Sequence, residues 1–152
     1  MFLVFSVGLV VCLGLIIYGR LNEHMVLPFD ISSVESVNLR YYLASSLADG
    51  DKEGSVVLRT DDEISRVYDT LQQIKLTRED RRTVIDSCHS LHITFYLKNG
   101  AAYRIDYADI SAPYEISFGW VGQSEKTVRG TGFNMMEIWE PYNYLTEYVD
   151  KK

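Results

Sequence analysis

A short acidic stretch at residues 49–54, Asp-Gly-Asp-Lys-Glu-Gly, is the first place where the residue types suggest chemistry. It matches the start of an EF-hand loop, where alternate side-chain oxygens converge on Ca²⁺ and a glycine permits a sharp turn. Asp49, Asp51 and Glu53 would supply those oxygens. The match is incomplete, because the fifth position is not Asp or Asn and the twelfth, Thr60, is not a bidentate glutamate. A polar hairpin loop is the simpler interpretation, and a calcium site is the alternative.

A second group of possible ligands consists of Cys88, His89 and His92. Thiolate and imidazole are the ligands that zinc and copper prefer. If this segment is extended, however, His89 and His92 point to opposite faces, because side chains alternate along a strand. A nucleophilic Cys88 would need a partnered base and an exposed thiolate. We therefore favour a structural role for these residues over a metal site or a thiol enzyme, and we expect no cofactor.

The chain is rich in tyrosine, with eleven residues of that type. Tyr96 follows Phe95 in an alternating segment and should face away from the apolar side, and either Tyr41 or Tyr42 must point outward for the same reason. Exposed aromatic side chains on a sheet can bind a peptide or a glycan. We favour the simpler interpretation, that the second helix or a loop covers them, and keep the binding role as the alternative. Tyr41, Tyr42 and Tyr96 form the candidate binding surface.

Familiar catalytic motifs are absent from the sequence. It contains no G-x-S-x-G, no phosphate-binding glycine-rich loop and no H-E-x-x-H. Acidic pairs such as Asp61 and Asp62 are explained by helix capping. We expect a non-catalytic binding or interaction module; the alternatives are an envelope enzyme that uses unrecognised acidic residues and an ion-sensing module.

Apolar alternation and turn residues predict the elements that position these side chains. Six strands are expected at residues 34–43, 55–59, 91–97, 101–107, 114–120 and 125–129. An Asn-Gly pair at residues 99–100 announces a hairpin between the third and fourth strands. A three-residue loop keeps one face apolar by pairing Leu97 with Ala101, Phe95 with Tyr103, Ile93 with Ile105 and Leu91 with Tyr107. Such a loop requires Gly100 to be left-handed.

Two helices are expected. Thr60 and Glu63 form a capping box at the start of a helix over residues 61–74, whose apolar stripe must cover a sheet. Pro141 suits the first turn of a closing helix over residues 141–149. The fold class is therefore α+β, with a mostly antiparallel sheet of about six strands and both helices packed on one face.

Residues 2–18, FLVFSVGLVVCLGLIIY, contain no charged residue. As a helix they would extend about 26 Å, which suits a short transmembrane anchor. A cleaved signal peptide and a buried core helix are the alternatives. Against the signal peptide, no small-x-small cleavage site follows the segment. We thus divide the chain into an anchor at residues 1–19, a stalk at residues 20–29 and one α+β domain at residues 30–152.

Net charge restricts the partners. The formal charge of −6 gives no basic field to attract nucleic acid, so we expect none as a partner. Cys12 lies in the anchor and Cys88 is alone in the domain, which excludes an intramolecular disulfide there.

Several segments have a familiar appearance: LPFD at residues 27–30, TDDEISRVY at residues 60–68 and FYLKNGAAYRI at residues 95–105. With the short anchor, they resemble small uncharacterised membrane-anchored or lipoprotein-like extracytoplasmic proteins of Gram-positive bacteria, over most of the chain. The lipobox of the lipoproteins is missing before Cys12. The motifs are structural, so the resemblance implies no catalytic residues.

Orientation in the membrane follows from this resemblance. Arg20, the first cation after the apolar segment, would by itself favour a cytoplasmic C-terminal part. The resemblance instead implies a single-pass cell-membrane protein with an extracytoplasmic domain, which binds a protein, a peptide or another envelope component. That is the localisation we expect.

Overall fold

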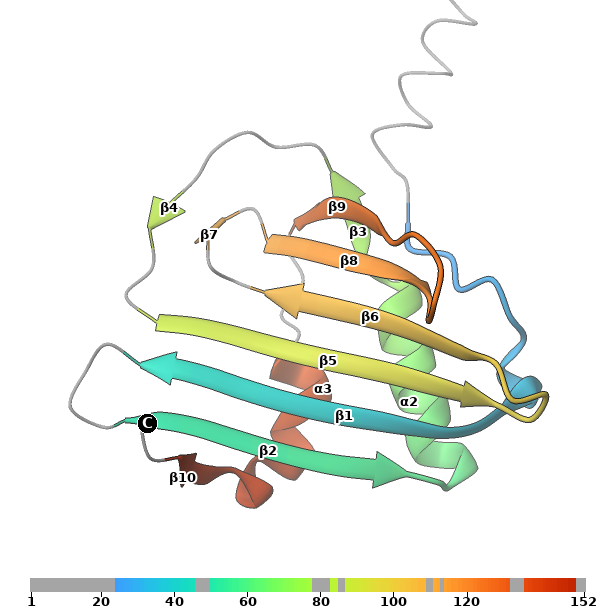
Figure 1. Cartoon of the computed structure of the whole chain (residues 1–152), viewed down its shortest axis with the longest axis horizontal. Coiled ribbons are helices and arrows are strands. Elements are labelled where there is room, and N and C mark those ends of the chain that lie inside the picture. The colour runs from blue at the N-terminus through green and yellow to red at the C-terminus, as the bar shows by residue number, and fades with distance from the viewer. Residues whose placement is uncertain are drawn as a thin grey trace, which may run out of the picture.

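A computed structural model of the chain describes residues 24–45, 50–77, 83–84, 87–108, 111–112, 114–131 and 136–149. These residues form an eight-stranded sheet with the order β10-β2-β1-β5-β6-β8-β9-β3, in which neighbouring strands are antiparallel (Figure 1). A separate two-stranded ribbon joins β4 to β7. The protein is thus an α+β fold built on a mostly antiparallel sheet, as the sequence predicts.

Most of the predicted strands are present, and several are longer than the sequence indicates. The strands are β1 (Val34–Ser45), β2 (Asp51–Leu58), β3 (Lys75–Thr77), β4 (Thr83–Val84), β5 (Ser87–Leu97), β6 (Ala102–Ala108), β7 (Ser111–Ala112), β8 (Tyr114–Trp120), β9 (Lys126–Thr131) and β10 (Glu147–Val149). The helical elements are η1 (Ile31–Ser33), α2 (Asp61–Gln72), α3 (Met136–Trp139) and η2 (Glu140–Leu145).

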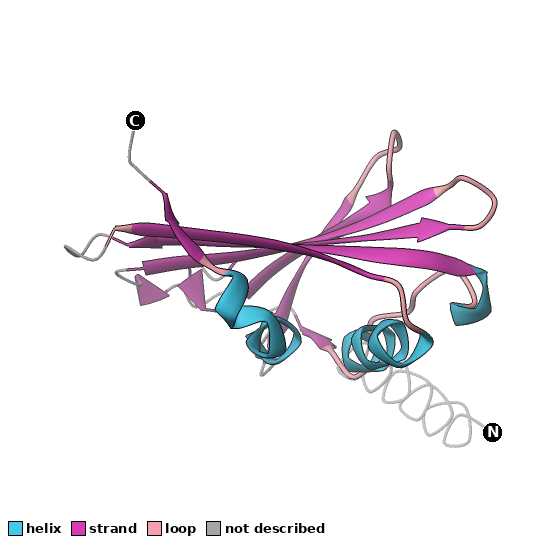
Figure 2. Ribbon diagram, turned by 90° about the horizontal axis from the view of Figure 1, so that it is seen from below, coloured by secondary structure: helices cyan, strands magenta, loops and turns pink. Residues whose placement is uncertain are grey.

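Helices lie on one side of the sheet only, among the described residues (Figure 2). The core fills the space between them and the sheet, and its centre consists of side chains that are fully buried, such as Val37, Leu39, Ile93, Phe95 and Ile105. Burial alternates along the strands, because successive side chains point to opposite faces. The other face of the sheet is therefore left without a helical cover in this part of the chain.

Helix α2 confirms the predicted capping box. The Glu63 backbone N–H donates to Thr60 Oγ1 at 3.4 Å, and the Thr60 hydroxyl donates to Glu63 Oε2 at 2.7 Å. The apolar stripe is buried at Ile64, Val67, Tyr68 and Leu71. The helix connects β2 near one edge of the sheet to β3 at the other edge, so it crosses the face that it covers (Figure 1).

The central hairpin has the predicted register. Phe95 pairs with Tyr103, Ile93 with Ile105 and Leu91 with Tyr107. The Leu97 N–H donates to the Ala101 carbonyl at 2.9 Å, which closes a three-residue loop. Gly100 has φ of +83°, the left-handed conformation that the loop requires.

The closing helix predicted over residues 141–149 is wrong. Residues 140–145 form the 3-10 helix η2, and residues 147–149 form the edge strand β10. Pro141 suits the first turn of either kind of helix, so its presence did not distinguish them. Trp139 is the main anchor of this region: it is fully buried and stacks on Tyr41 with ring centroids 5.4 Å apart.

The polar loop predicted at residues 49–54 is also wrong over most of its length. Strand β2 begins at Asp51, and its first residues pair with both β1 and β10. Asp49 lies outside the described residues, as does the charged stretch at residues 78–82. Gly54 lies within β2, and Trp139 packs so closely against it that a Cβ would collide with the indole ring.

The segment before η1 is part of the domain from Met25 onward. Met25 and Leu27 are buried in the core, although the sequence places residues 20–29 in a stalk. Phe29 contacts the rings of Tyr68 and Phe95, at centroid distances of 6.0 and 5.3 Å. None of the helices in the described ranges is long and apolar enough to cross a membrane; the anchor predicted at residues 2–18 lies outside those ranges.

Candidate functional site

The uncovered face of the sheet carries polar side chains in rows that run across the strands. Asn38 on β1 pairs with Thr94 on β5, and Thr94 pairs with Arg104 on β6. In the next row, Arg40 pairs with His92, and His92 pairs with Asp106. These positions alternate with core residues, so they all point to the same, uncovered face.

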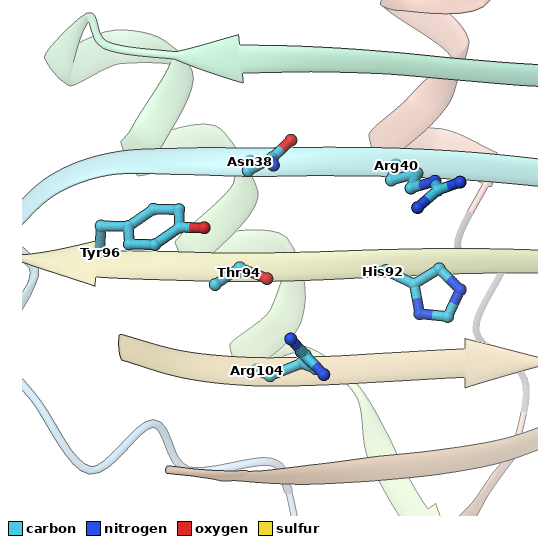
Figure 3. A pocket seen from close by; sticks show the side chains of 6 residues that line it. All are labelled: Asn38, Arg40, His92, Thr94, Tyr96 and Arg104. Carbon is cyan, nitrogen blue, oxygen red and sulfur yellow. The ribbon is translucent and has the colours of Figure 1, made fainter. Parts of the chain in front are cut away.

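A hollow of about 340 Å³ lies on this face, over β1, β5 and β6. Six side chains line it: Asn38, Arg40, His92, Thr94, Tyr96 and Arg104 (Figure 3). Its size is within the range of small-molecule sites, but its lining is polar where most such sites are apolar. We call this feature the cationic hollow, because its lining includes two arginines and no carboxylate.

Two side chains that line the hollow, Arg40 and His92, already have a carboxylate partner. Arg40 donates from Nε to Glu53 Oε1 at 2.9 Å, and the Arg40 side chain is still 61% exposed. His92 Nδ1 lies 2.6 Å from Asp106 Oδ1. Because an ionised carboxylate only accepts hydrogen bonds, the proton of this contact belongs to Nδ1, and His92 Nε2 is left for a ligand.

Arg104 differs from these groups. It is exposed, and no described residue makes an ion pair or a side-chain hydrogen bond with its guanidinium. Arg104 lies in the middle of β6, where pairing with β5 and β8 holds its backbone in place. Its cross-strand neighbours are Thr94 and Gly119. In Figure 3 the guanidinium of Arg104 stands between β5 and β6, next to Thr94. A rigid sheet thus presents an unpaired cation among neutral donor groups.

A second hollow of about 220 Å³ adjoins the first and has the opposite character. Asp106 and Glu115 contribute carboxylates to its lining, together with Ser90 and Ser117. His92 lines both hollows. The uncovered face therefore changes from cationic to acidic across the single side chain of His92.

The acidic residues suggested as calcium ligands have other partners. Asp51 accepts a hydrogen bond from the Tyr42 hydroxyl at 2.9 Å, and Glu53 binds Arg40. Both side chains lie in a paired strand, which lacks the sharp turn of an EF-hand loop. Asp49 is outside the described part of the chain.

The structure separates His89 from His92. The His89 ring lies 6.1 Å from the ring of the buried Tyr41, whereas His92 lies in the cationic hollow on the other face. Cys88 is in β5, and its side chain is not among those described. Within the described ranges, no group of three or more His, Cys, Asp or Glu residues could hold a metal ion.

The three tyrosines of the candidate binding surface also separate. Tyr41 is buried at 4% exposure beneath Trp139, so it belongs to the core. Tyr42 donates to Asp51 and is half-buried. Tyr96 is 43% exposed and lines the end of the cationic hollow, with its hydroxyl directed along the face toward Asn38 and Thr94 (Figure 3).

Sequence reasoning singled out neither arginine of the hollow. The register that it predicted for the hairpin already places Thr94 opposite Arg104 and His92 opposite Asp106, so that signal was present. The contribution of Arg40 could not be found in this way, because it depends on β1 lying next to β5, which are distant in the chain. No family model, curated protein or solved structure matches the chain.

Proposed function

We propose that this protein is a non-catalytic binding module, anchored in the cell membrane and exposed outside the cytoplasm, which binds an envelope component through the uncovered face of its sheet. The cationic hollow is the observation that supports this proposal most strongly. A sheet face that carries unpaired donors in a concave, rigid frame is suited to bind a polar ligand. The uncharged apolar sequence of residues 2–18 and the resemblance to exported proteins support the placement.

The strands that carry the hollow form a rigid frame. The lining comes from the central strands β1, β5 and β6, which are paired on both sides. Their opposite face is packed into the core, so the backbone beneath the hollow is held in place before a ligand arrives. A preorganised site of this kind loses less conformational freedom on binding than a site on loops.

Substitution of Thr94 tests the proposal. Thr94 lies between the two arginines of the hollow, and Thr94→Glu would place a carboxylate there that neutralises them. The full chain, held in detergent, is incubated with envelope fragments of a Gram-positive bacterium, and the bound material is measured. We expect Thr94→Glu to abolish binding, while Ser124→Glu, the same charge change in an exposed turn, leaves it intact. Equal binding by both variants would contradict the proposal.

A hydrolase is a second candidate, favoured by the contact of 2.6 Å between His92 and Asp106. A carboxylate that holds Nδ1–H leaves Nε2 able to accept a proton from water, as in a general base. Among the described residues, however, no hydroxyl or thiol is hydrogen-bonded to His92 Nε2 to serve as a nucleophile. His92→Gln separates the two candidates, because it would stop hydrolysis of a captured component without preventing its capture.

A further inference from the structure

We infer that the cationic hollow binds a single phosphate group on an otherwise uncharged ligand, with Arg104 as its principal contact. This inference names the ligand class of the site above, and it therefore rests on the proposed function.

Charge complementarity selects an anion. Arg104 has no partner among the described residues, and Arg40 shares its charge with one partly exposed carboxylate. From the spacing of strands and residues, the backbones of the two arginines are about 12 Å apart on either side of β5. Their long side chains can therefore meet an anion that lies over Thr94 and His92. Hydrogen bonds from a guanidinium to an anion are charge-assisted, and they are stronger than hydrogen bonds between neutral groups.

The number of donors favours phosphate over carboxylate. Asn38, Thr94 and Tyr96 add an amide and two hydroxyls around the same space as the Arg104 guanidinium. A guanidinium can bind either anion with two parallel hydrogen bonds. A phosphate group has more terminal oxygens than a carboxylate, so it can use the three neutral donors in addition.

The acidic hollow argues against ligands with many charges. Asp106 and Glu115 lie directly beyond His92 on the same face. A polyanion laid along the sheet would bring its next negative groups against these carboxylates, which is unfavourable. One phosphate, or the phosphate end of a neutral molecule, avoids that repulsion.

Tyr96 indicates where the rest of the ligand lies. Its ring is 43% exposed at the end of the hollow that is remote from Asp106. An exposed aromatic ring offers an apolar surface to a sugar or polyol, while its hydroxyl is left to form a hydrogen bond. The carrier of the phosphate would therefore extend over Tyr96.

Titration of the full chain with inorganic phosphate tests this inference. The protein is labelled uniformly with ¹⁵N in detergent micelles, and the Arg104 Nε–H signal is assigned by its loss in Arg104→Gln. We expect sodium phosphate, at pH 7 and constant ionic strength, to shift this signal with saturation at a Kd on the order of 1 mM. Arg104→Gln should weaken phosphate binding, followed through the Thr94 amide, about tenfold or more. Arg59→Gln, the same change at an exposed arginine outside the hollow, should have no effect.

Two further titrations decide the ligand class. Sodium acetate should bind more weakly than phosphate, and polyphosphate should bind no more tightly per molecule than phosphate. Tighter binding of acetate, or a gain in affinity with the length of polyphosphate, would overturn the inference. So would a phosphate shift that Arg104→Gln leaves unchanged. If phosphate fails to bind while Thr94→Glu still abolishes the capture of envelope fragments, the phosphate assignment fails alone; if both fail, the proposed function fails too.

Discussion

The roles of some residues follow from local sequence patterns, whereas the roles of others depend on neighbours that the fold brings together. Thr60 and Glu63 belong to the first kind, because their spacing in the sequence is enough to predict their contact. Arg104 belongs to the second, since its significance depends on an unpaired guanidinium beside donors from two other strands. Local sequence patterns could therefore predict the capping box, whereas the site emerged from cross-strand geometry.

The capping box gives a stability prediction at this scale. Thr60→Ala removes an acceptor from the first turn of α2, and we expect a loss of about 1 kcal/mol in the free energy of unfolding. The hydrogen bond from Thr60 also lowers the pKa of Glu63. A carboxyl whose pKa is lowered in the folded state adds stability above its ordinary pKa, and this contribution disappears as the pH falls through the folded value.

Urea denaturation at pH 7 and at pH 3 measures both effects. The difference between the wild-type protein and Thr60→Ala should be larger at pH 7 than at pH 3. Thr70→Ala is a poor control because its hydroxyl binds the Arg66 carbonyl. Ser124→Ala, in an exposed turn, should leave the stability within about 0.5 kcal/mol. An unchanged difference at the two pH values would show that the ionised Glu63 contributes nothing through this contact.

At the scale of elements, segments with strong local signals were predicted well and edge segments were not. The hairpin of β5 and β6 followed from an Asn-Gly turn and from the requirement for one apolar face. Strand β10 has three exposed residues, so it carries no alternation to detect. Strand β3 has only three residues and pairs with β9, more than fifty positions away in the chain. Such pairings depend on how all the strands of the sheet are arranged, which no local sequence pattern reveals.

Gly54 gives a prediction about how the C-terminal elements pack on β2. A Cβ at this position would lie 2.6 Å from a ring carbon of Trp139, which is fully buried. We expect Gly54→Ala to destabilise the protein by about 1–3 kcal/mol, the usual cost of overpacking. Thermal unfolding measures this. Ser55→Ala on the opposite face serves as the control, because it removes only a long, exposed hydrogen bond of 3.4 Å to Asn38. A melting temperature equal to that of the wild-type protein would contradict the close packing of Trp139.

At the scale of the whole molecule, the domain includes chain that the sequence assigned to a stalk. Met25 and Leu27 are buried, and the Met25 N–H donates to the carbonyl of Ile74, which lies between α2 and β3 and far along the chain. No local pattern therefore distinguished these residues from a linker. Phe29→Ala should therefore destabilise the domain by about 3 kcal/mol, because its ring contacts four other aromatic rings. Val26→Ala, at a side chain that is 76% exposed, should have little effect. If urea denaturation gave Phe29→Ala the same free energy of unfolding as the wild-type protein, residues 24–30 would not contribute to the core.

The proposed placement of the domain is also a property of the whole molecule. If residues 2–18 anchor an extracytoplasmic domain, protease added to intact cells should digest a C-terminal epitope tag on the full chain. A cytoplasmic marker protein in the same cells should survive. Digestion of the tag only after the cells are lysed would contradict the orientation.

The central claim is that the uncovered face of the sheet binds the ligand. Its most direct test is the ¹H–¹⁵N spectrum of the full chain in micelles, recorded while soluble envelope fragments are added. We expect the largest changes in chemical shift at the lining of the cationic hollow, at Asn38, Thr94 and Arg104. Changes confined to the helix-covered side, along α2 and η2, would contradict it.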